Sequence, residues 1–334
     1  MPLILNRKNV LDVYKEAAQK KWVIPTFNTE NLTCTEAILS AALEYSKKIN
    51  KPDLPVTIGI TNQYSHRSQS VYYTHTRLWD IGLKLFLADI GILTGKGSPF
   101  EKLNVMVHLD HTQWDSDKPL LGWDMNQFSM IMYDASALPF EENIKLTAKF
   151  VEKHGHEIVI EGACDEIVDA TGDTRSSLTT PEQAIKYLNE TNCDFIVANL
   201  GTEHRASASD LKYYGDMARK ISKLTGTKLV LHGTSSVGND QVRNLFDDGI
   251  AKVNIWTILE RDSSPVLFED MVRNSSKVTG KEMTETMIKS GLLGDKVDRT
   301  SKASLSHYTT SYRQEIVFNE MKKIVLDYFK LWYV

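Results

Sequence analysis

The run Val105-Met106-Val107-His108-Leu109-Asp110-His111 begins as a buried β-strand and ends in His-x-Asp-His. Its first half is apolar and β-branched, which is typical of a strand that is covered on both faces. A purely structural strand has no need of two imidazoles and a carboxylate in its last four residues. If the end of this strand opens into a pocket, Asp110 and His111 reach it together. A carboxylate there is suited to proton transfer and an imidazole to metal ligation.

Seven further short apolar runs accompany this strand, and segments with helical periodicity lie between them. The predicted strands, in chain order, cover residues 22–28, 54–60, 105–111, 128–133, 157–161, 195–201, 228–233 and 251–256. Near-continuous apolar strands that alternate with helices indicate a parallel sheet with both faces covered. Eight such β-then-α units favour a closed barrel over an open sheet. We therefore expect the α/β class and a (β/α)8, or TIM, barrel.

The chain is expected to form one domain over residues 1–334. The barrel should occupy about residues 1–262, and a helical C-terminal extension, longer than a barrel needs, about 263–334. Residues 309–333 carry apolar side chains at helical spacing, so this segment should cover the barrel or form a subunit contact. Two capping-box patterns, at Thr33 with Glu36 and at Thr180 with Gln183, predict helix starts.

The composition excludes several classes of protein. Of the 334 residues, 42% are hydrophobic and 25% are charged, and the formal net charge is -4. No basic excess is available to neutralise phosphates, so we expect no nucleic-acid partner. No window approaches the ~18 apolar residues of a membrane span, and residues 1–8 are too polar for a signal peptide. Cys34, Cys164 and Cys193 are far apart, which predicts no disulfide framework and favours a reducing compartment. We therefore expect a cytoplasmic protein without a membrane partner.

Polar side chains recur just after the predicted strands, at the end of a barrel where active sites form. They are Asn28, Asp110, His111, Asp134, Ser136, Glu161, His204, His232 and Asn254. His111, His204 and His232 follow three different strands, and three neutral imidazoles with an open coordination position describe a catalytic zinc site. A single histidine in such a place is more often a hydrogen-bonded structural residue, so the metal hypothesis depends on the three together.

The neighbours of these histidines suggest further roles. Asp110 is the candidate general acid or base, although a carboxylate there could instead cap a loop N–H. Residues 233–236 (Gly-Thr-Ser-Ser) and 254–257 (Asn-Ile-Trp-Thr) follow the last two strands, where barrels often bind phosphate through N–H and hydroxyl groups. The first of these runs is weak evidence on its own, because many such runs are simple turns. His108 is expected to support the site from the core. The histidines at positions 66, 75, 154, 156 and 307 are expected in loops or at the surface.

Five stretches, in order along about residues 6–259, resemble a known enzyme family. They cover residues 108–111, 134–143, 200–204, 229–233 and 251–255; the first reads His-Leu-Asp-His and the third Leu-Gly-Thr-Glu-His. Together they resemble the class II, zinc-dependent ketose-bisphosphate aldolases, which include fructose- and tagatose-bisphosphate aldolases. The resemblance implies an enzyme that reversibly cleaves a phosphorylated ketose to dihydroxyacetone phosphate and an aldehyde.

The resemblance also implies a role for each matching residue. His111, His204 and His232 would hold one Zn²⁺ ion, which would bind dihydroxyacetone phosphate and stabilise its enediolate as a Lewis acid. Asp110 would deprotonate the C4 hydroxyl in cleavage and protonate the aldehyde oxygen in condensation. No lysine Schiff base is then required. The implied substrate and phosphate contacts are Asn28, Gly233, Ser235, Asn254 and Thr257.

The chain departs from the family pattern around this site. Arg205 stands where the family usually has a glycine whose backbone serves the phosphate or a monovalent cation. After the fifth strand only Glu161 matches an acidic-x-acidic run, and residues 167–173 replace a glycine-rich loop, so the second base is left open. Ser236 and Trp256 replace smaller or acidic residues. Arg205 could read a second anionic group, take the place of the monovalent cation, or pair with a nearby carboxylate. Arg205 and Glu161 are thus candidate specificity residues.

Three functions are compatible with these observations. The leading hypothesis is a zinc-dependent aldolase acting on a phosphorylated sugar. The second is a metal-dependent aldolase for a different or unphosphorylated ketose, because the departures lie where a substrate is selected. The third is a barrel that binds a sugar phosphate without turning it over, which Asp110 disfavours because binding alone needs no proton-transfer group. A homodimer or homotetramer is expected from the apolar C-terminal helix and from family habit.

Overall fold

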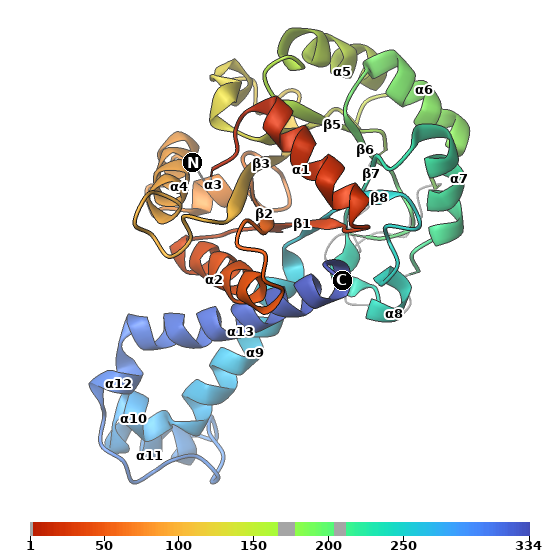
Figure 1. Ribbon diagram of the computed structural model, residues 1–334. Helices are drawn as coiled ribbons and strands as arrows, with labels where there is room; N and C mark the ends of the chain where they lie inside the picture. The colour runs from red at the N-terminus through yellow and green to blue at the C-terminus, as the bar shows by residue number, and fades with distance from the viewer. Residues whose placement is uncertain (1–2, 166–177, 204–211) are drawn as a thin grey trace.

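Eight parallel strands close into a barrel in the computed structural model, which describes residues 3–165, 178–203 and 212–334. The strands are β1 (Ile24–Asn28), β2 (Pro55–Thr61), β3 (Asn104–Gln113), β4 (Met130–Asp134), β5 (Val159–Ala163), β6 (Phe195–Val197), β7 (Leu229–Leu231) and β8 (Ile250–Ile255). They are hydrogen-bonded in sequence order, and β8 returns to pair with β1. The predicted α/β barrel fold is therefore confirmed (Figure 1).

Helices surround this barrel and continue beyond it. Those that accompany the strands are α1 (Arg7–Gln19), α2 (Leu32–Lys48), α3 (Gln69–Tyr72), α4 (Trp79–Leu93), α5 (Phe140–His154), α6 (Pro181–Thr191), α7 (Gly215–Thr225) and α8 (Asn239–Val242). The C-terminal helices are α9 (Thr257–Arg273), α10 (Ser275–Thr279), α11 (Lys281–Lys289), α12 (Leu305–Tyr308) and α13 (Thr310–Trp332). Short 3₁₀ turns lie at Leu120–Gly122, Met125–Gln127 and Thr234–Ser236. None of the helices within the described ranges is long and apolar enough to cross a membrane.

The element boundaries differ from the sequence prediction where local hydrogen bonds decide them. The fifth strand begins at Val159 rather than at residue 157, because the amides of Glu157 and Ile158 still bond the His154 carbonyl at the end of α5. The cap of α2 is Asn31, whose side chain accepts from the Cys34 amide, so the capping box predicted two residues later is wrong. The box at Thr180 and Gln183 is confirmed, with both reciprocal bonds present.

The N-terminal end of the barrel is closed by α1, which lies across it in Figure 1. Tyr14 on this helix is buried, donates to the Met130 sulfur at 3.5 Å, and packs against the Phe195 ring with centroids 4.7 Å apart. Arg7 at the start of the helix pairs with Asp194 at 2.7 Å. Because this end is covered, the strand ends opposite to it are where a substrate can enter.

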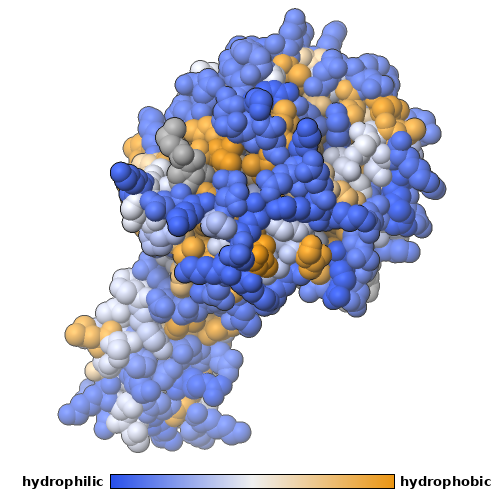
Figure 2. Space-filling model, viewed as in Figure 1, coloured by the Kyte–Doolittle hydropathy of each residue, from blue (hydrophilic) through white to orange (hydrophobic). Residues whose placement is uncertain are grey.

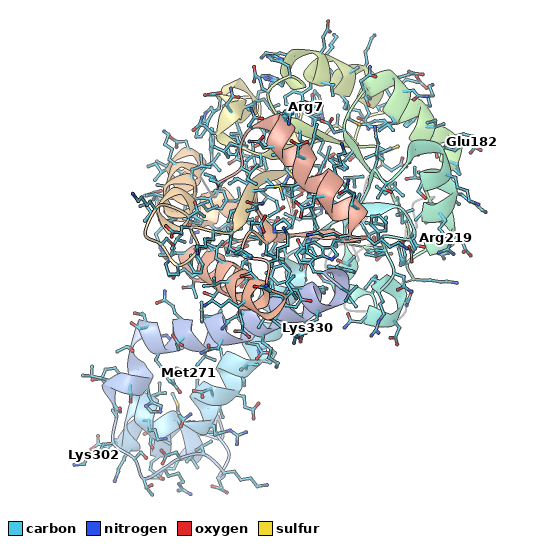
Figure 3. The ribbon with its side chains drawn as sticks, in the orientation of Figure 1. Arg7, Glu182, Arg219, Met271, Lys302 and Lys330 are labelled. Carbon is cyan, nitrogen blue, oxygen red and sulfur yellow. The ribbon has the colours of Figure 1, made fainter. Side chains whose placement is uncertain are left out.

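The C-terminal helices project away from the barrel and then return to it. Figure 1 shows α9 leaving the barrel, α10 to α12 forming a separate lobe, and α13 running back alongside α9. Figure 3 places Lys302 in the projecting lobe and Lys330 where α13 meets the barrel. The end of α13 is anchored by side chains: Trp332 donates its indole N–H to the Val242 carbonyl at 2.8 Å, and Tyr333 its hydroxyl to the Pro55 carbonyl at 2.8 Å. The expected helical tail is thus present.

This anchor can be tested through stability. Trp332 is 2% exposed, and truncating a buried tryptophan removes both its packing and its hydrogen bond. Trp332→Ala is therefore expected to lower the free energy of unfolding by about 3–5 kcal/mol, as measured by urea denaturation. Phe268→Ala on α9 is the control, because Phe268 is 72% exposed and its truncation should change the free energy of unfolding by less than about 0.5 kcal/mol. Equal effects of the two changes would show that the tail is not docked as described.

Candidate active site

A cavity opens at the carboxyl ends of the strands, and it gathers most of the residues that the sequence nominated. Asn28 from β1, Asp110 and His111 from β3, and Asn254 from β8 line it, as do His232 and Gly233 after β7. Ser235, in the 3₁₀ turn after β7, and Thr257, the first residue of α9, complete the nominated lining.

Three nominated residues stand apart from this group. His204, the third expected metal ligand, and Arg205 lie outside the described residues. Glu161 is fully buried within the barrel rather than in the cavity lining. Its carboxylate lies 2.7 Å from the Lys252 ammonium.

Asp110, His111 and His232 form a candidate metal centre. Each can offer one ligand atom, and these atoms lie within 4.8 Å of one another, with all three residues buried. His111 Nδ1 lies 2.9 Å from the Asp134 carboxylate, so a metal would be ligated through Nε2. A carboxylate–histidine pair of this kind orients a ligating ring. Two imidazoles with a carboxylate suit a divalent transition metal such as zinc, so the donor set fits the expected ion.

Local backbone geometry sets the position of His111. Its φ of 44° lies in the left-handed region, which non-glycine residues seldom adopt. The pairing of β3 with β4 shifts register between Leu109 and Thr112, around the same residue. An irregular, strained residue at the end of an otherwise regular strand is typical of a functional site.

The charges in this group reinforce one another. Burial raises the pKa of Asp134, but the hydrogen bond and charge of His111 outweigh it and bring that pKa to about 2. Burial lowers the pKa of His111, yet the carboxylates of Asp110 and Asp134 raise it overall. Asp134 therefore stays ionised at neutral pH and holds the imidazole in place.

Asp110 is held by two amide donors. Asn28 Nδ2 donates to Oδ2 at 2.7 Å, and Asn254 Nδ2 donates to Oδ1 at 2.8 Å. Burial raises the pKa of Asp110, but the charge of His111 and a hydrogen bond with His108 outweigh it, and the pKa lies well below its usual range. The carboxylate is thus ionised and fixed, as a proton acceptor should be. His108 lies buried in the core on the same strand face, with its Nε2 3.5 Å from Asp110 Oδ1.

Two glycines leave room for this arrangement. Gly59 on β2 is paired with Asn28 on β1, and a Cβ at Gly59 would collide with the Asn28 amide oxygen. Gly233 has a φ of 70°, and a Cβ there would come within 2.7 Å of the Glu203 carbonyl. Any larger residue at either position would displace a side chain or loop of the cavity.

Sequence reasoning missed the segment after β2, where a loop supplies Tyr64, His66 and Arg67 to the same cavity and the start of α3 supplies Gln69. The Tyr64 ring stacks on the His111 imidazole, with centroids 4.2 Å apart and planes 4° apart, and His66 packs edge-on against Tyr64 at 4.7 Å. His66 was expected in a loop or at the surface; it does lie in a loop, but it faces the site. The signal was an aromatic, histidine-bearing run just after a predicted strand.

Buried polar contacts hold this loop in place. Asp117, after β3, accepts from Asn62 Nδ2 at 2.8 Å and from the Gln63 amide at 3.1 Å. Arg67 makes a bidentate ion pair with the buried carboxylate of Glu30. These pairings are between segments far apart in sequence, which is why the sequence did not reveal them.

A second, more polar cavity adjoins the first and shares Tyr64, His66 and His111 with it. Its other lining residues include Gln113, Asp134, Ser136 and Asp165. Amide, hydroxyl and carboxylate groups of this kind are suited to hydrogen bonds with sugar hydroxyls.

The Asp134–His111 contact predicts a defined change in metal binding. Asp134→Asn keeps the shape but removes the charge that orients the imidazole, so affinity for Zn²⁺ is expected to fall by about 10–100-fold. Competition with a chromogenic chelator measures that affinity directly. Asp124→Asn, at an exposed site outside the cavity, is the matched control and should leave the affinity unchanged. Equal affinity in Asp134→Asn and the wild type would contradict the orienting role.

Buried imidazoles, an ionised carboxylate and glycine-bearing turns lie together at the strand ends of a parallel barrel. This arrangement defines a (β/α)8-barrel enzyme with a candidate metal centre. The model of the class-II fructose-bisphosphate aldolase family matches residues 8–292, and the chain belongs to that family. It is accordingly an aldolase, a lyase of carbon–carbon bonds, and membership supports a ketose bisphosphate as its substrate class.

Individual relatives agree with this assignment. The chain is 25% identical over 319 residues to a fructose-bisphosphate aldolase of Staphylococcus aureus, covering 94% of this chain and 99% of the relative. It is 27% identical over 250 residues to that of Geobacillus stearothermophilus, covering 74% and 79%. Among solved structures, the fructose-bisphosphate aldolase of Campylobacter jejuni has a TM-score of 0.74 at 18% identity, covering 99% of this chain and 95% of that one. The YdjI aldolase of Escherichia coli K12 has a TM-score of 0.66 at 20% identity, covering 96% and 94%. These two likenesses concern the fold.

Proposed function

We propose that this chain is a zinc-dependent aldolase that reversibly cleaves a ketose bisphosphate into dihydroxyacetone phosphate and an aldehyde. The observation that carries the proposal is the ionised carboxylate of Asp110, held by two amides within one cavity beside buried His111 and His232. A barrel that only bound a sugar phosphate would have no use for such a group, so the non-catalytic alternative is disfavoured.

The metal would be held by His111 and His232, with His204 as the third ligand on the strength of the sequence pattern. When bound there, Zn²⁺ supplies Lewis acidity, which polarises the substrate carbonyl. Asp134 keeps the His111 ring in place through its 2.9 Å hydrogen bond. Tyr64 covers one face of the same ring and excludes water from it.

Asp110 would move the proton. In cleavage its carboxylate takes the proton of the C4 hydroxyl as the C3–C4 bond breaks, and in condensation it returns that proton to the aldehyde oxygen. Asn28 and Asn254 bind one carboxylate oxygen each, so the group keeps one orientation while it gains and loses the proton. Its lowered pKa favours the basic form at neutral pH.

The phosphate would bind at the turn after β7 and the start of α9. Gly233 and Ser235 lie in the first of these segments, and Thr257 is the first residue of a 17-residue helix. Backbone N–H groups at a helix N-terminus, together with the helix dipole, favour an anion. All three residues line the cavity that contains Asp110.

A second candidate function is a metal-dependent aldolase for a different or unphosphorylated ketose. The adjoining cavity favours it, because Gln113, Ser136 and Asp165 offer partners for hydroxyl groups. We further propose that Arg205 either reads a second anionic group or takes the place of a monovalent cation, and that Glu161 influences specificity from within the barrel.

We also propose that the chain forms a homodimer or a homotetramer. A homodimer or homotetramer would cover apolar side chains that are exposed on the projecting helices, among them Met283 on α11 and Leu305 on α12. Figure 2 shows apolar residues at the surface of that lobe among mostly hydrophilic ones. Cytoplasmic location and the lack of nucleic-acid and membrane partners stay expectations from the composition.

A coupled assay for dihydroxyacetone phosphate tests the proposal. The zinc-loaded protein would be offered fructose 1,6-bisphosphate, tagatose 1,6-bisphosphate, fructose 1-phosphate and fructose. Chelator-sensitive cleavage of a bisphosphate with the highest kcat/KM supports the leading proposal, while preference for a monophosphate or a free ketose supports the second. Absence of cleavage across the panel, with metal bound, would contradict both for these substrates.

A further inference from the structure

The barrel interior beside Asp110 holds an ion pair that the proposed reaction does not use. Lys252 on β8 and Glu161 on β5 are both fully buried, and the Lys252 ammonium lies 2.7 Å from Glu161 Oε1. The interior of such barrels is usually filled by valine, isoleucine and leucine. Apolar replacements for a buried ion pair are often neutral or stabilising, because desolvation of the two charges offsets their attraction. Stability alone therefore does not explain this pair.

The other contacts of Lys252 lead toward the active site. Its ammonium donates to Asn254 Oδ1 at 2.6 Å and lies 3.2 Å from His108 Nε2. Together, Asn254 Oδ1 and the Glu161 carboxylate account for two of the three N–H donors of the lysine. Lys252 and Asn254 are two residues apart on one strand, so both side chains face the barrel interior. Asn254 lines the cavity, whereas Lys252 does not.

These contacts fix which way the Asn254 amide points. A lysine ammonium can only donate a hydrogen bond, and an ionised carboxylate can only accept one. The amide of Asn254 lies between Lys252 and Asp110, so one orientation satisfies both neighbours: Oδ1 toward Lys252 and Nδ2 toward Asp110 Oδ1. If the amide turned over, its oxygen would face the carboxylate and Asp110 would lose one of its two amide donors.

We propose that Lys252, held in place by Glu161, is a positioning residue that locks the Asn254 amide and thereby orients Asp110 for proton transfer. The inference rests on the proposed function, because it assigns Lys252 a part in the same reaction. It also gives the buried lysine a role that involves no contact with substrate. The chain of contacts runs from Glu161 through Lys252 and Asn254 to Asp110.

A matched pair of variants tests the donor role. Lys252→Met with Glu161→Gln removes both charges and the donor, while Lys252→Gln with Glu161→Gln removes both charges but keeps an N–H that can bond Asn254. The methionine pair should lower kcat by about 10–100-fold, the size of effect that follows a small misplacement of a catalytic group. The glutamine pair should recover kcat to within about fivefold of the wild type. Because Glu161→Gln is common to the two pairs, any effect of Glu161 on substrate binding should be equal in them, and their KM values should agree within about threefold.

Adding the methionine pair to an Asn254→Ala variant tests whether Lys252 acts on Asp110 through Asn254. If Lys252 acts through Asn254, the added loss in kcat should be less than about threefold, because the two changes break the same chain of contacts. A repeat of the full 10–100-fold loss would overturn the proposal, as would equal kcat values in the methionine and glutamine pairs. A methionine pair that fails to fold beside a folded glutamine pair would make Lys252 structural and would also overturn it.

Two further measurements keep the outcomes separate. Asp194→Asn, which weakens the ion pair with Arg7 at the closed end of the barrel, is the control and should change the thermal unfolding midpoint but not kcat. A wild-type chain that cleaves no ketose phosphate overturns the proposed function and this inference with it. An active wild type beside an equally active methionine pair overturns the inference alone.

Discussion

Asp110→Asn is expected to lower kcat for ketose-phosphate cleavage by about 10²–10⁴-fold, the range that a positioned general acid or base contributes. The substitution keeps the size of the side chain but removes the proton acceptor. Its amide would also place an N–H group against an Asn28 or Asn254 N–H that now donates to the carboxylate. Steady-state kinetics with the best substrate of the panel measures the effect, and KM should change far less than kcat.

The control for this change lies five residues along the chain. Asp115→Asn makes the same replacement at an exposed position that does not line the cavity, so kcat should stay within about twofold of the wild type. Bound metal must also be measured, because Asp110 is one of the groups that could contact an ion. Full activity of Asp110→Asn would show that another group moves the proton. Inactivity that is restored by excess Zn²⁺ would make Asp110 a metal ligand instead.

The barrel could be predicted from the sequence because each buried parallel strand is a short run of apolar residues, which local composition reveals. Eight apolar runs sufficed, since each strand must bury both faces whichever neighbours it pairs with. The strand-end residues Asp110, His232 and Asn254 followed from the same logic, because all strands of such a barrel end on one side. The predicted start of the fifth strand was two residues early, because the Glu157 amide still bonds the His154 carbonyl at the end of α5.

What the sequence did not predict depends on contacts between distant segments. Tyr64 stacks on His111. It lies further along the loop after β2 than the strand-end positions that the sequence analysis considered. Lys252 is a charge within an otherwise apolar strand, and its partner Glu161 lies ninety-one positions earlier in the sequence. Such pairings have no local pattern, because a charge in a strand is stable only if a partner arrives from elsewhere in the fold.

Loss of the metal is the second large effect that we expect. His232→Ala removes one imidazole of the candidate centre, and with it a ligand that has no replacement among the described residues around Asp110 and His111. The bound divalent ion should fall well below one per chain by elemental analysis. Because a metal ion contributes several kcal/mol of charge stabilisation in such reactions, kcat/KM should fall by about three orders of magnitude.

Removing the divalent ion with a chelator and adding Zn²⁺ back tests the need for the metal without a substitution. Removing the ion from the wild type should abolish cleavage, and Zn²⁺ should restore it, whereas His232→Ala should not recover at the same concentration. His75→Ala, at an exposed histidine, is the control and should keep both metal and rate. A wild type that stays active with no divalent ion bound would refute the metal centre. Asp110 would then have to remove the hydroxyl proton without a Lewis acid. The lowered pKa of Asp110 makes it a weak base. A weak base removes a hydroxyl proton only when the leaving carbanion is strongly stabilised, so the reaction would be more difficult.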